Sequence, residues 1–151
     1  MSEENKELTA DLSGQIMTFT CNDETYAFDI KDITDIIEIP EITKIPKLPE
    51  FLLGVINLRG QVVPVMDFNL RIGKPRQEYD SKTCIIVTER DKANIGIIVN
   101  RVLDVEAITK KEVIPYPKKG SVIWGYLDRG GKRTALIDWY ALVGQEKKQT
   151  L

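Results

Sequence analysis

The sequence of 151 residues contains no histidine and only two cysteines. Without imidazole, Ser-His or Cys-His nucleophilic catalysis, His-ligated metal sites and histidine pH switches are excluded within this chain. The two thiols, Cys21 and Cys84, lie far apart in apolar runs that are typical of strands. Two lone thiols cannot form a four-thiolate zinc site, and we expect both to be reduced and buried. We therefore expect no metal and no other cofactor.

Strong charge and long apolar runs are also missing. The formal net charge is −2 and the pI is about 5.3, which gives no electrostatic footprint for a nucleic-acid partner. No apolar stretch approaches the roughly 18 residues that span a bilayer, and the acidic N-terminus does not resemble a signal peptide. We expect a cytoplasmic protein with no direct membrane insertion.

Catalytic patterns are scarce. No serine lies in a nucleophile motif, and no phosphate-binding or dinucleotide-binding glycine pattern occurs. Four carboxylates could in principle pair for acid–base chemistry: Asp29, Asp67, Asp104 and Asp138. A small carboxylate-dependent enzyme is therefore one alternative, which predicts an Asp/Glu pair in a pocket. A small-barrel module that binds nucleic acid through its few basic clusters is another, which predicts salt-dependent binding to single strands.

The sequence is instead rich in β-branched residues. Ile and Val total 30 residues against 18 for Leu and Ala, and stiff branched side chains favour strands. Short apolar runs between turn residues predict strands at 16–21, 25–28, 61–66, 83–88, 94–99 and 133–137. Hairpin turns are predicted at 22–24 and 90–93, where Asn and Asp bond the local backbone. Many short strands with little helical signal indicate small β-barrels or a sandwich.

An internal repeat sets the organisation of the chain. At an offset of 71 residues, Gly54, Gly60, Asp67 and Gly73 coincide with Gly125, Gly131, Asp138 and Gly144. Upstream the offset is 69, which aligns apolar positions 26–36 with 95–105 and Pro46 with Pro115. Two copies of about 65 residues would each be marginal alone, so we predict a pseudo-symmetric pair of small β-barrels that pack together.

Each copy also contains short helical signals. Apolar residues three apart at 30, 33 and 36, and again at 99, 102 and 105, predict one helical turn that leads into a strand. Asp67 and Asp138 are predicted N-caps of a short helix, with Gly73 and Gly144 just past the end. Most of the apolar residues in these stripes must be core, but a seam between barrels would suit an amphipathic partner helix.

The segment Asn57-Leu58-Arg59-Gly60 lies between two apolar strands. Gly60 supplies the positive φ of a tight turn, and Arg59 projects at its tip. Arg59 is then either a solvated arginine or a recognition residue whose guanidinium binds a carboxylate on a partner. Pro64 follows in the next strand and predicts an edge strand or a bulge, because proline cannot donate to a ladder.

The run from Gly54 to Phe68, Gly-Val-Ile-Asn-Leu-Arg-Gly-Gln-Val-Val-Pro-Val-Met-Asp-Phe, resembles the CheW family of bacterial chemotaxis coupling proteins. Further segments resemble the family at 26–30, 45–46, 49–51, 94–102 and 104–105. The resemblance thus extends over nearly all of 15–144. Phe68 stands where many members have Leu, a conservative difference.

The resemblance implies a mainly β fold of two pseudo-repeated, intertwined five-stranded SH3-like barrels with a few short helices. It implies a single domain at 15–144, with subdomains at about 15–73 and 79–144 whose edge strands can be exchanged. Residues 1–14 and 145–151 are expected to be flexible tails.

The resemblance also implies a noncatalytic adaptor that is monomeric when free. Such adaptors bind the cytoplasmic tips of methyl-accepting chemotaxis proteins and the regulatory domain of the histidine kinase CheA, and they are recruited to membrane-associated receptor arrays. Position by position, the implied receptor-binding residues are Arg59, Gly96, Val102 and Val105. The implied kinase-binding residues are Ile33 and Gly54.

Overall fold

The structure is a computed structural model that describes residues 12–118 and 120–144. The expected tails at 1–11 and 145–151 lie outside the described residues. Residues 12–14 of the expected N-terminal tail are described: Leu12 packs on an apolar cluster, Ser13 N donates to Asp29 at 2.9 Å, and Gly14 O accepts from Ile108 N at 2.9 Å. Within the described part of the chain, no helix is long and apolar enough to cross a membrane.

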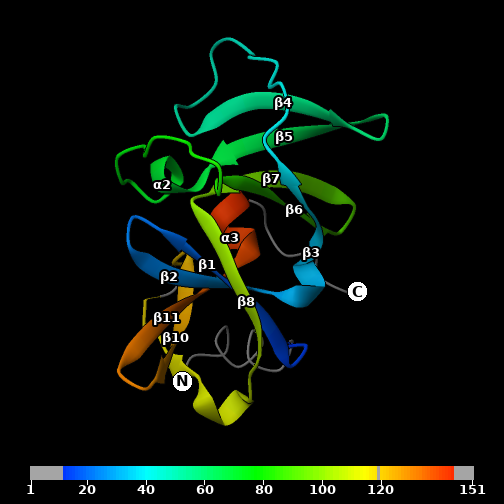
Figure 1. The fold of residues 1–151 in the computed structure, drawn as a ribbon. Coiled ribbons are helices and arrows are strands. Elements are labelled where there is room, and N and C mark those ends of the chain that lie inside the picture. The colour runs from blue at the N-terminus through cyan, green and yellow to red at the C-terminus, as the bar shows by residue number, and fades with distance from the viewer. Residues whose placement is uncertain (1–11, 119, 145–151) are drawn as a thin grey trace. The chain divides into compact units, whose positions relative to one another are not determined.

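The fold is mainly β, as the sequence predicts, and strands dominate the described chain (Figure 1). Its strands are β1 (Gln15–Cys21), β2 (Glu24–Asp29), β3 (Ile33–Glu38), β4 (Leu52–Leu58), β5 (Gln61–Asp67), β6 (Cys84–Arg90), β7 (Ala93–Val99), β8 (Arg101–Ala107), β9 (Ile114–Pro115), β10 (Ile123–Arg129) and β11 (Lys132–Ile137). Its helical elements are η1 (Ile30–Asp32), α2 (Phe68–Arg71), η2 (Lys110–Glu112) and α3 (Trp139–Val143).

The strands form two sheets of matching order. One sheet runs β8-β1-β2-β11-β10-β9 and the other runs β3-β6-β7-β5-β4. The β11–β2 pair is parallel, with Thr134 opposite Thr25, and the β5–β7 pair is parallel in the register that the repeat offsets require. The β10–β11 and β4–β5 hairpins also share their register. The sheets are therefore two copies of one unit.

The copies do not divide the chain at its middle. Within the described residues, one compact unit contains 12–19, 24–31, 103–118 and 120–144, and we call it unit 1. The other, unit 2, contains 20–23 and 32–102. β1 and β2 come first in the sequence, yet most of their residues belong to the unit that contains the C-terminal strands.

Each unit has its own apolar core. In unit 1 the cluster contains Ile16, Ala27, Ile108, Trp124, Leu127 and Leu136. In unit 2 it contains Ile56, Val63, Val65, Ile85, Val87 and Ile98. In unit 2 the pairs Val63/Val65 on β5 and Ile85/Val87 on β6 alternate along their strands, which places one side of that sheet inside its barrel.

The turns and caps follow the sequence closely. The predicted hairpin turns are confirmed, with positive φ at both central residues of Asn22-Asp23 and Asp91-Lys92, as in type I′ turns. Both helix caps are also confirmed. Asp67 accepts from Leu70 N at 3.1 Å, and Asp138 accepts from Tyr140 N at 3.1 Å.

Three expectations are wrong in detail. The helical turn occurs only in the first copy, as η1, because β8 begins directly at Arg101 in the second copy. Pro46 and Pro115 are not equivalent: Ile114 pairs with Tyr126 as Thr43 pairs with Val55, so the offset is already 71 there. Pro64 lies on a central strand, opposite Val55, and its missing donor is tolerated because the ladder with β7 begins at Val65.

Candidate partner-binding sites

Arg59 occupies the tip of the β4–β5 hairpin. Its φ is 52° and that of Gly60 is 82°, so the turn needs two residues in the left-handed region. Asn57 stabilises this turn, because its Oδ1 accepts from Gly60 N at 3.0 Å. Asn57 and Gly60 of the Asn-Leu-Arg-Gly sequence are therefore explained by the turn itself, whereas the Arg59 side chain is not.

The Arg59 side chain is 74% exposed, yet it has a fixed partner. Its Nη2 lies 2.8 Å from Asp35 Oδ1 and its Nη1 lies 3.5 Å from Asp35 Oδ2. Asp35 is on β3 and Arg59 follows β4, so the ion pair connects the two edge strands of this sheet. Sequence reasoning missed Asp35, although the repeat aligns it with Asp104.

A pocket of about 260 Å³ lies beside this ion pair in unit 2. Its lining residues come from β3, the β4–β5 hairpin, β6 and β7: Thr34, Asp35, Leu58, Arg59, Gln61, Val63, Val87, Glu89 and Asn94. The charged groups lie around a floor of buried valines. This arrangement suits recognition of a polar protein surface better than enclosure of a small molecule.

The two predicted kinase-binding residues also lie in unit 2. Ile33 begins β3 opposite Thr88, next to a bulge, and is half-buried. Gly54 is buried in β4 with a φ of 147°, and a Cβ there would lie 2.1 Å from the Thr43 carbonyl oxygen. Gly54 therefore acts by letting the 39–51 segment approach β4, and it offers no side chain to a partner.

Gly96, a predicted receptor-binding residue, is buried in the middle of β7. It lies opposite Val65 on one side and Val87 on the other. A Cβ there would lie 2.8 Å from Ile85 Cγ2. Its position allows only an indirect influence on a surface, through the packing of the sheet.

Val102 and Val105 are both on β8 and differ in environment. Val102 is half-buried and belongs to unit 2, whereas Val105 is 54% exposed and belongs to unit 1. Among the six predicted residues, Arg59 and Val105 are thus the ones whose side chains are largely exposed. Ile36, which the repeat aligns with Val105, is 47% exposed on β3.

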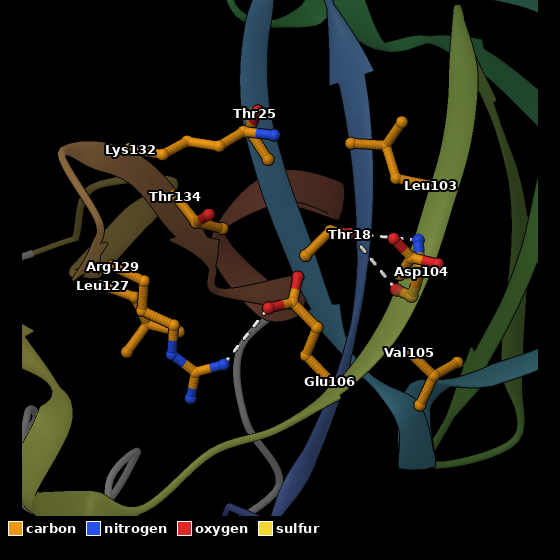
Figure 2. Close-up of a pocket in the computed structure, with 10 residues that line it drawn as sticks. All are labelled: Thr18, Thr25, Leu103, Asp104, Val105, Glu106, Leu127, Arg129, Lys132 and Thr134. Carbon is orange, nitrogen blue, oxygen red and sulfur yellow. Dashed lines mark hydrogen bonds and ion pairs between the residues drawn. The ribbon is translucent and has the colours of Figure 1, made fainter.

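Unit 1 contains a second pocket, of about 400 Å³, which sequence reasoning did not predict. Figure 2 shows β8 on one wall with Asp104, Val105 and Glu106, while Arg129 reaches toward Glu106 from the facing side. The other lining residues are Thr18, Thr25, Leu103, Leu127, Lys132 and Thr134.

Arg129 is held firmly at this pocket. Its Nη1 donates to Glu106 Oε1 at 3.1 Å, and its Nη2 donates to Glu112 Oε2 at 2.8 Å and to the Ala107 carbonyl at 2.6 Å. Its hydrogen bonds to Glu112 lower the pKa of that carboxyl and contribute to a raised pKa of the guanidinium. No pattern in the sequence points to this clamp beyond the charged residues themselves.

The carboxylates considered for acid–base chemistry have structural roles or lie apart. Asp67 and Asp138 cap helices, and Asp67 Oδ2 also accepts from the Tyr79 hydroxyl at 2.7 Å. Burial raises the pKa of Tyr79, and this hydrogen bond raises it further. Asp29 accepts from the backbone of Ser13 and Lys31. Across the described ranges, no group of three or more Cys, Asp and Glu residues could hold a metal ion.

Comparison with known proteins decides the family. A family model described as "CheW-like domain" matches residues 15–147. The chain belongs to this family. It is 33% identical over 104 residues to a protein named chemotaxis protein CheW from Klebsiella aerogenes, and 34% identical over 99 residues to one of the same name from Thermotoga maritima. These alignments cover 69% and 66% of this chain, and 63% and 65% of those proteins.

A solved structure agrees in fold. The scaffolding protein TtCheW from Thermoanaerobacter tengcongensis superposes with a TM-score of 0.81 at 30% identity, over 91% of this chain and 97% of that one. The mainly β architecture with a few short helices that the resemblance implies is thereby confirmed, and its two sheets have six and five strands. The CheW-like family is a noncatalytic scaffolding family, which agrees with the expectation that the chain is not an enzyme.

Proposed function

We propose that this chain is a cytoplasmic adaptor that couples methyl-accepting chemotaxis proteins to the histidine kinase CheA. It binds the cytoplasmic receptor tip and the regulatory domain of the kinase on separate surfaces, and it is recruited to membrane-associated receptor arrays. The observation that carries the proposal is an exposed arginine held at a rigid hairpin tip, in a member of the CheW-like family. Relatives are named as chemotaxis and scaffolding proteins, which supports the same role.

Receptor binding is assigned to Arg59, Gly96 and Val102 of unit 2 and to Val105 of unit 1. Asp35 orients the guanidinium while leaving it 74% exposed, so part of its donor capacity remains available to a polar or acidic group. Val105 offers an exposed apolar side chain to one face of a receptor helix. Gly96 is buried, so its contribution is the close packing of β7 on its neighbours.

Kinase binding is assigned to the part of unit 2 that Ile33 and Gly54 shape. Ile33 is half-buried and can contribute apolar contact area, whereas Gly54 sets the position of the 39–51 segment. Exposed apolar residues of that segment include Ile45 and Leu48. Such side chains are the type that forms the centre of a protein interface.

Coupling then needs no covalent step. An adaptor that holds both partners at once fixes their geometry, so a change in receptor conformation can bias kinase activity through differential binding. The free adaptor is a monomer in this proposal, and assembly is driven by the partners.

The proposal is tested by titrating receptor-tip fragments and the kinase regulatory domain separately with wild-type protein and the Arg59→Ala variant. Arg59→Ala should weaken receptor binding about tenfold, a loss typical of a charge-assisted contact, and should leave kinase binding and the melting curve unchanged. Arg133→Ala is the matched control, because that arginine is 60% exposed and also has an acidic partner. Unchanged receptor affinity for Arg59→Ala would remove Arg59 from the site.

A further inference from the structure

The two pockets are the same place in two copies of one unit. With the repeat offsets, Thr34 and Asp35 on β3 correspond to Leu103 and Asp104 on β8, and Val87 on β6 corresponds to Thr18 on β1. Leu58 and Gln61, which flank one hairpin turn, correspond to Arg129 and Lys132, which flank the other. All of these residues line one pocket or the other.

The copies differ at one decisive position. The turn residues Arg59-Gly60 of unit 2 correspond to Gly130-Gly131 of unit 1, and the first residue has nearly the same φ in both, 52° and 57°. The arginine that binds Asp35 is therefore replaced by Gly130, which has no side chain. A Cβ at Gly130 would meet nothing within 4 Å, so the space for a longer side chain is open.

Unit 1 does have an arginine nearby, but it binds elsewhere. Arg129 is one residue before the turn and is held by Glu106, Glu112 and the Ala107 carbonyl. Two carboxylates thus share one guanidinium. Asp104 lines the pocket, and no ion pair of Asp104 is found in the part of the chain that the structure describes. Its backbone is fixed because Thr18 Oγ1 donates to Asp104 O and accepts from Asp104 N, both at 3.2 Å.

Further charged groups lie around the pocket. Lys132 also lines it, and no ion pair of Lys132 within 4.0 Å is found among the described residues. Arg129 is held by Glu106, which lines the pocket, and by Glu112, which does not. The lining charges therefore balance, and among the described residues Asp104 and Lys132 are the lining charges for which no ion pair is found. The volume also fits, since this pocket is larger than the one that Arg59 borders, about 400 Å³ against 260 Å³.

We propose that the unit 1 pocket receives an arginine side chain from the receptor segment that packs on Val105, and that Asp104 binds it as Asp35 binds Arg59. Val105 lines the same pocket as its neighbour Asp104, so the apolar contact and the charged contact both come from β8 (Figure 2). The inference rests on the proposed receptor binding and names the chemistry that the receptor must present there. One unit supplies its arginine from its own chain, and the other takes it from a partner.

The first test uses substitutions with receptor-tip fragments. Asp104→Asn should weaken receptor binding about tenfold, the loss expected for a charge-assisted pair. Asp128→Asn is the matched control, because Asp128 is an exposed carboxylate of the same unit that does not line the pocket. Gly130→Arg should also weaken binding, because it supplies the missing arginine from the chain itself and occupies Asp104. Gly130→Gln carries the same backbone strain without the charge and should bind as the wild type does.

The second test needs no receptor. Acetyl-arginine-amide is titrated into isotope-labelled protein, with acetyl-citrulline-amide as the neutral control, while backbone amide shifts are followed by NMR. The arginine compound should shift the amides of Thr18, Asp104 and Thr134, and Asp104→Asn or Gly130→Arg should abolish these shifts. If the shifts appear without receptor binding, the pocket chemistry stands and the receptor assignment fails. If Asp104→Asn changes neither readout while Arg59→Ala still weakens receptor binding, the inference is overturned and the adaptor proposal survives.

Discussion

Arg59 Nη2 lies 2.8 Å from Asp35 Oδ1, an ion pair between the hairpin after β4 and the edge strand β3. The guanidinium remains 74% exposed while the Asp35 side chain is 19% exposed. The ion pair therefore orients an exposed guanidinium from a carboxylate that is mostly buried. It fixes the direction of a cation that would otherwise sample many rotamers.

Removing the carboxylate should reduce receptor binding without unfolding the protein. Asp35→Ala frees Arg59, so receptor affinity should fall by about threefold to tenfold because the guanidinium must be ordered on binding. The free energy of unfolding should change by less than about 1 kcal/mol, since exposed ion pairs contribute little. Isothermal titration and urea unfolding measure the two quantities. An Asp35→Ala protein that binds receptor as tightly as wild type would show that orientation of Arg59 is irrelevant.

The glycines of the first repeat should differ sharply in tolerance. Gly54→Ala places a Cβ 2.1 Å from the Thr43 carbonyl oxygen at a φ of 147°, so we expect a loss of more than about 3 kcal/mol or failure to fold. Gly60→Ala has a positive φ but no neighbour within 4 Å, so it should cost only about 1 kcal/mol. Urea unfolding of both variants provides the comparison. Equal losses would contradict the close approach at Gly54.

The ion pair between Arg90 Nε and Asp32 Oδ1, at 3.2 Å, should matter for stability. The side chains are 18% and 5% exposed, so Arg90→Met would remove the Arg90 guanidinium from a buried carboxylate. We expect a loss of about 3 kcal/mol in the free energy of unfolding. Arg133→Met is the control, with a 60% exposed side chain and an expected change below about 0.5 kcal/mol. Similar small changes in both would mean that the Asp32 site is hydrated.

Stability should fall in alkaline solution through Cys21. Burial raises the pKa of this thiol from 9.0 to about 12. Above pH 9 the unfolded chain therefore loses a proton that the native state keeps, and stability decreases as pH rises from about 9 toward 12, by about 1.4 kcal/mol per pH unit for this group. Urea unfolding at several pH values, with wild type and Cys21→Ala, measures the slope. The variant should lose that part of it, and identical slopes would contradict the assignment.

Much of the fold follows from local rules that can be applied to the sequence directly. Asp67 and Asp138 cap helices because a carboxylate accepts from exposed backbone amides, and Asn22-Asp23 turns because these residues tolerate positive φ. The repeat predicted two similar halves, and the matching strand orders show them.

Local patterns could not show the contacts between segments that lie far apart in the sequence. The pairing of β2 with β11 joins segments more than a hundred residues apart, so membership of β1 and β2 in unit 1 has no local signature. The motif singles out Arg59 as a candidate, but no local pattern points to Asp35, since only the pairing of the sheet brings β3 to that hairpin. The Arg129 clamp was missed for the same reason: its acceptors come from β8 and the η2 segment.

Co-sedimentation with both partners tests the central claim most directly. Receptor-tip fragments on a sedimentable support are mixed with the kinase regulatory domain and with wild-type, Arg59→Glu or Ile33→Asp protein. Wild type should bring the kinase domain down with the receptor. Arg59→Glu should leave adaptor and kinase domain together in the supernatant, whereas Ile33→Asp should sediment without the kinase domain. Sedimentation of the kinase domain to the same extent with no adaptor, or loss of both partners in both folded variants, would contradict an adaptor with separate receptor and kinase surfaces.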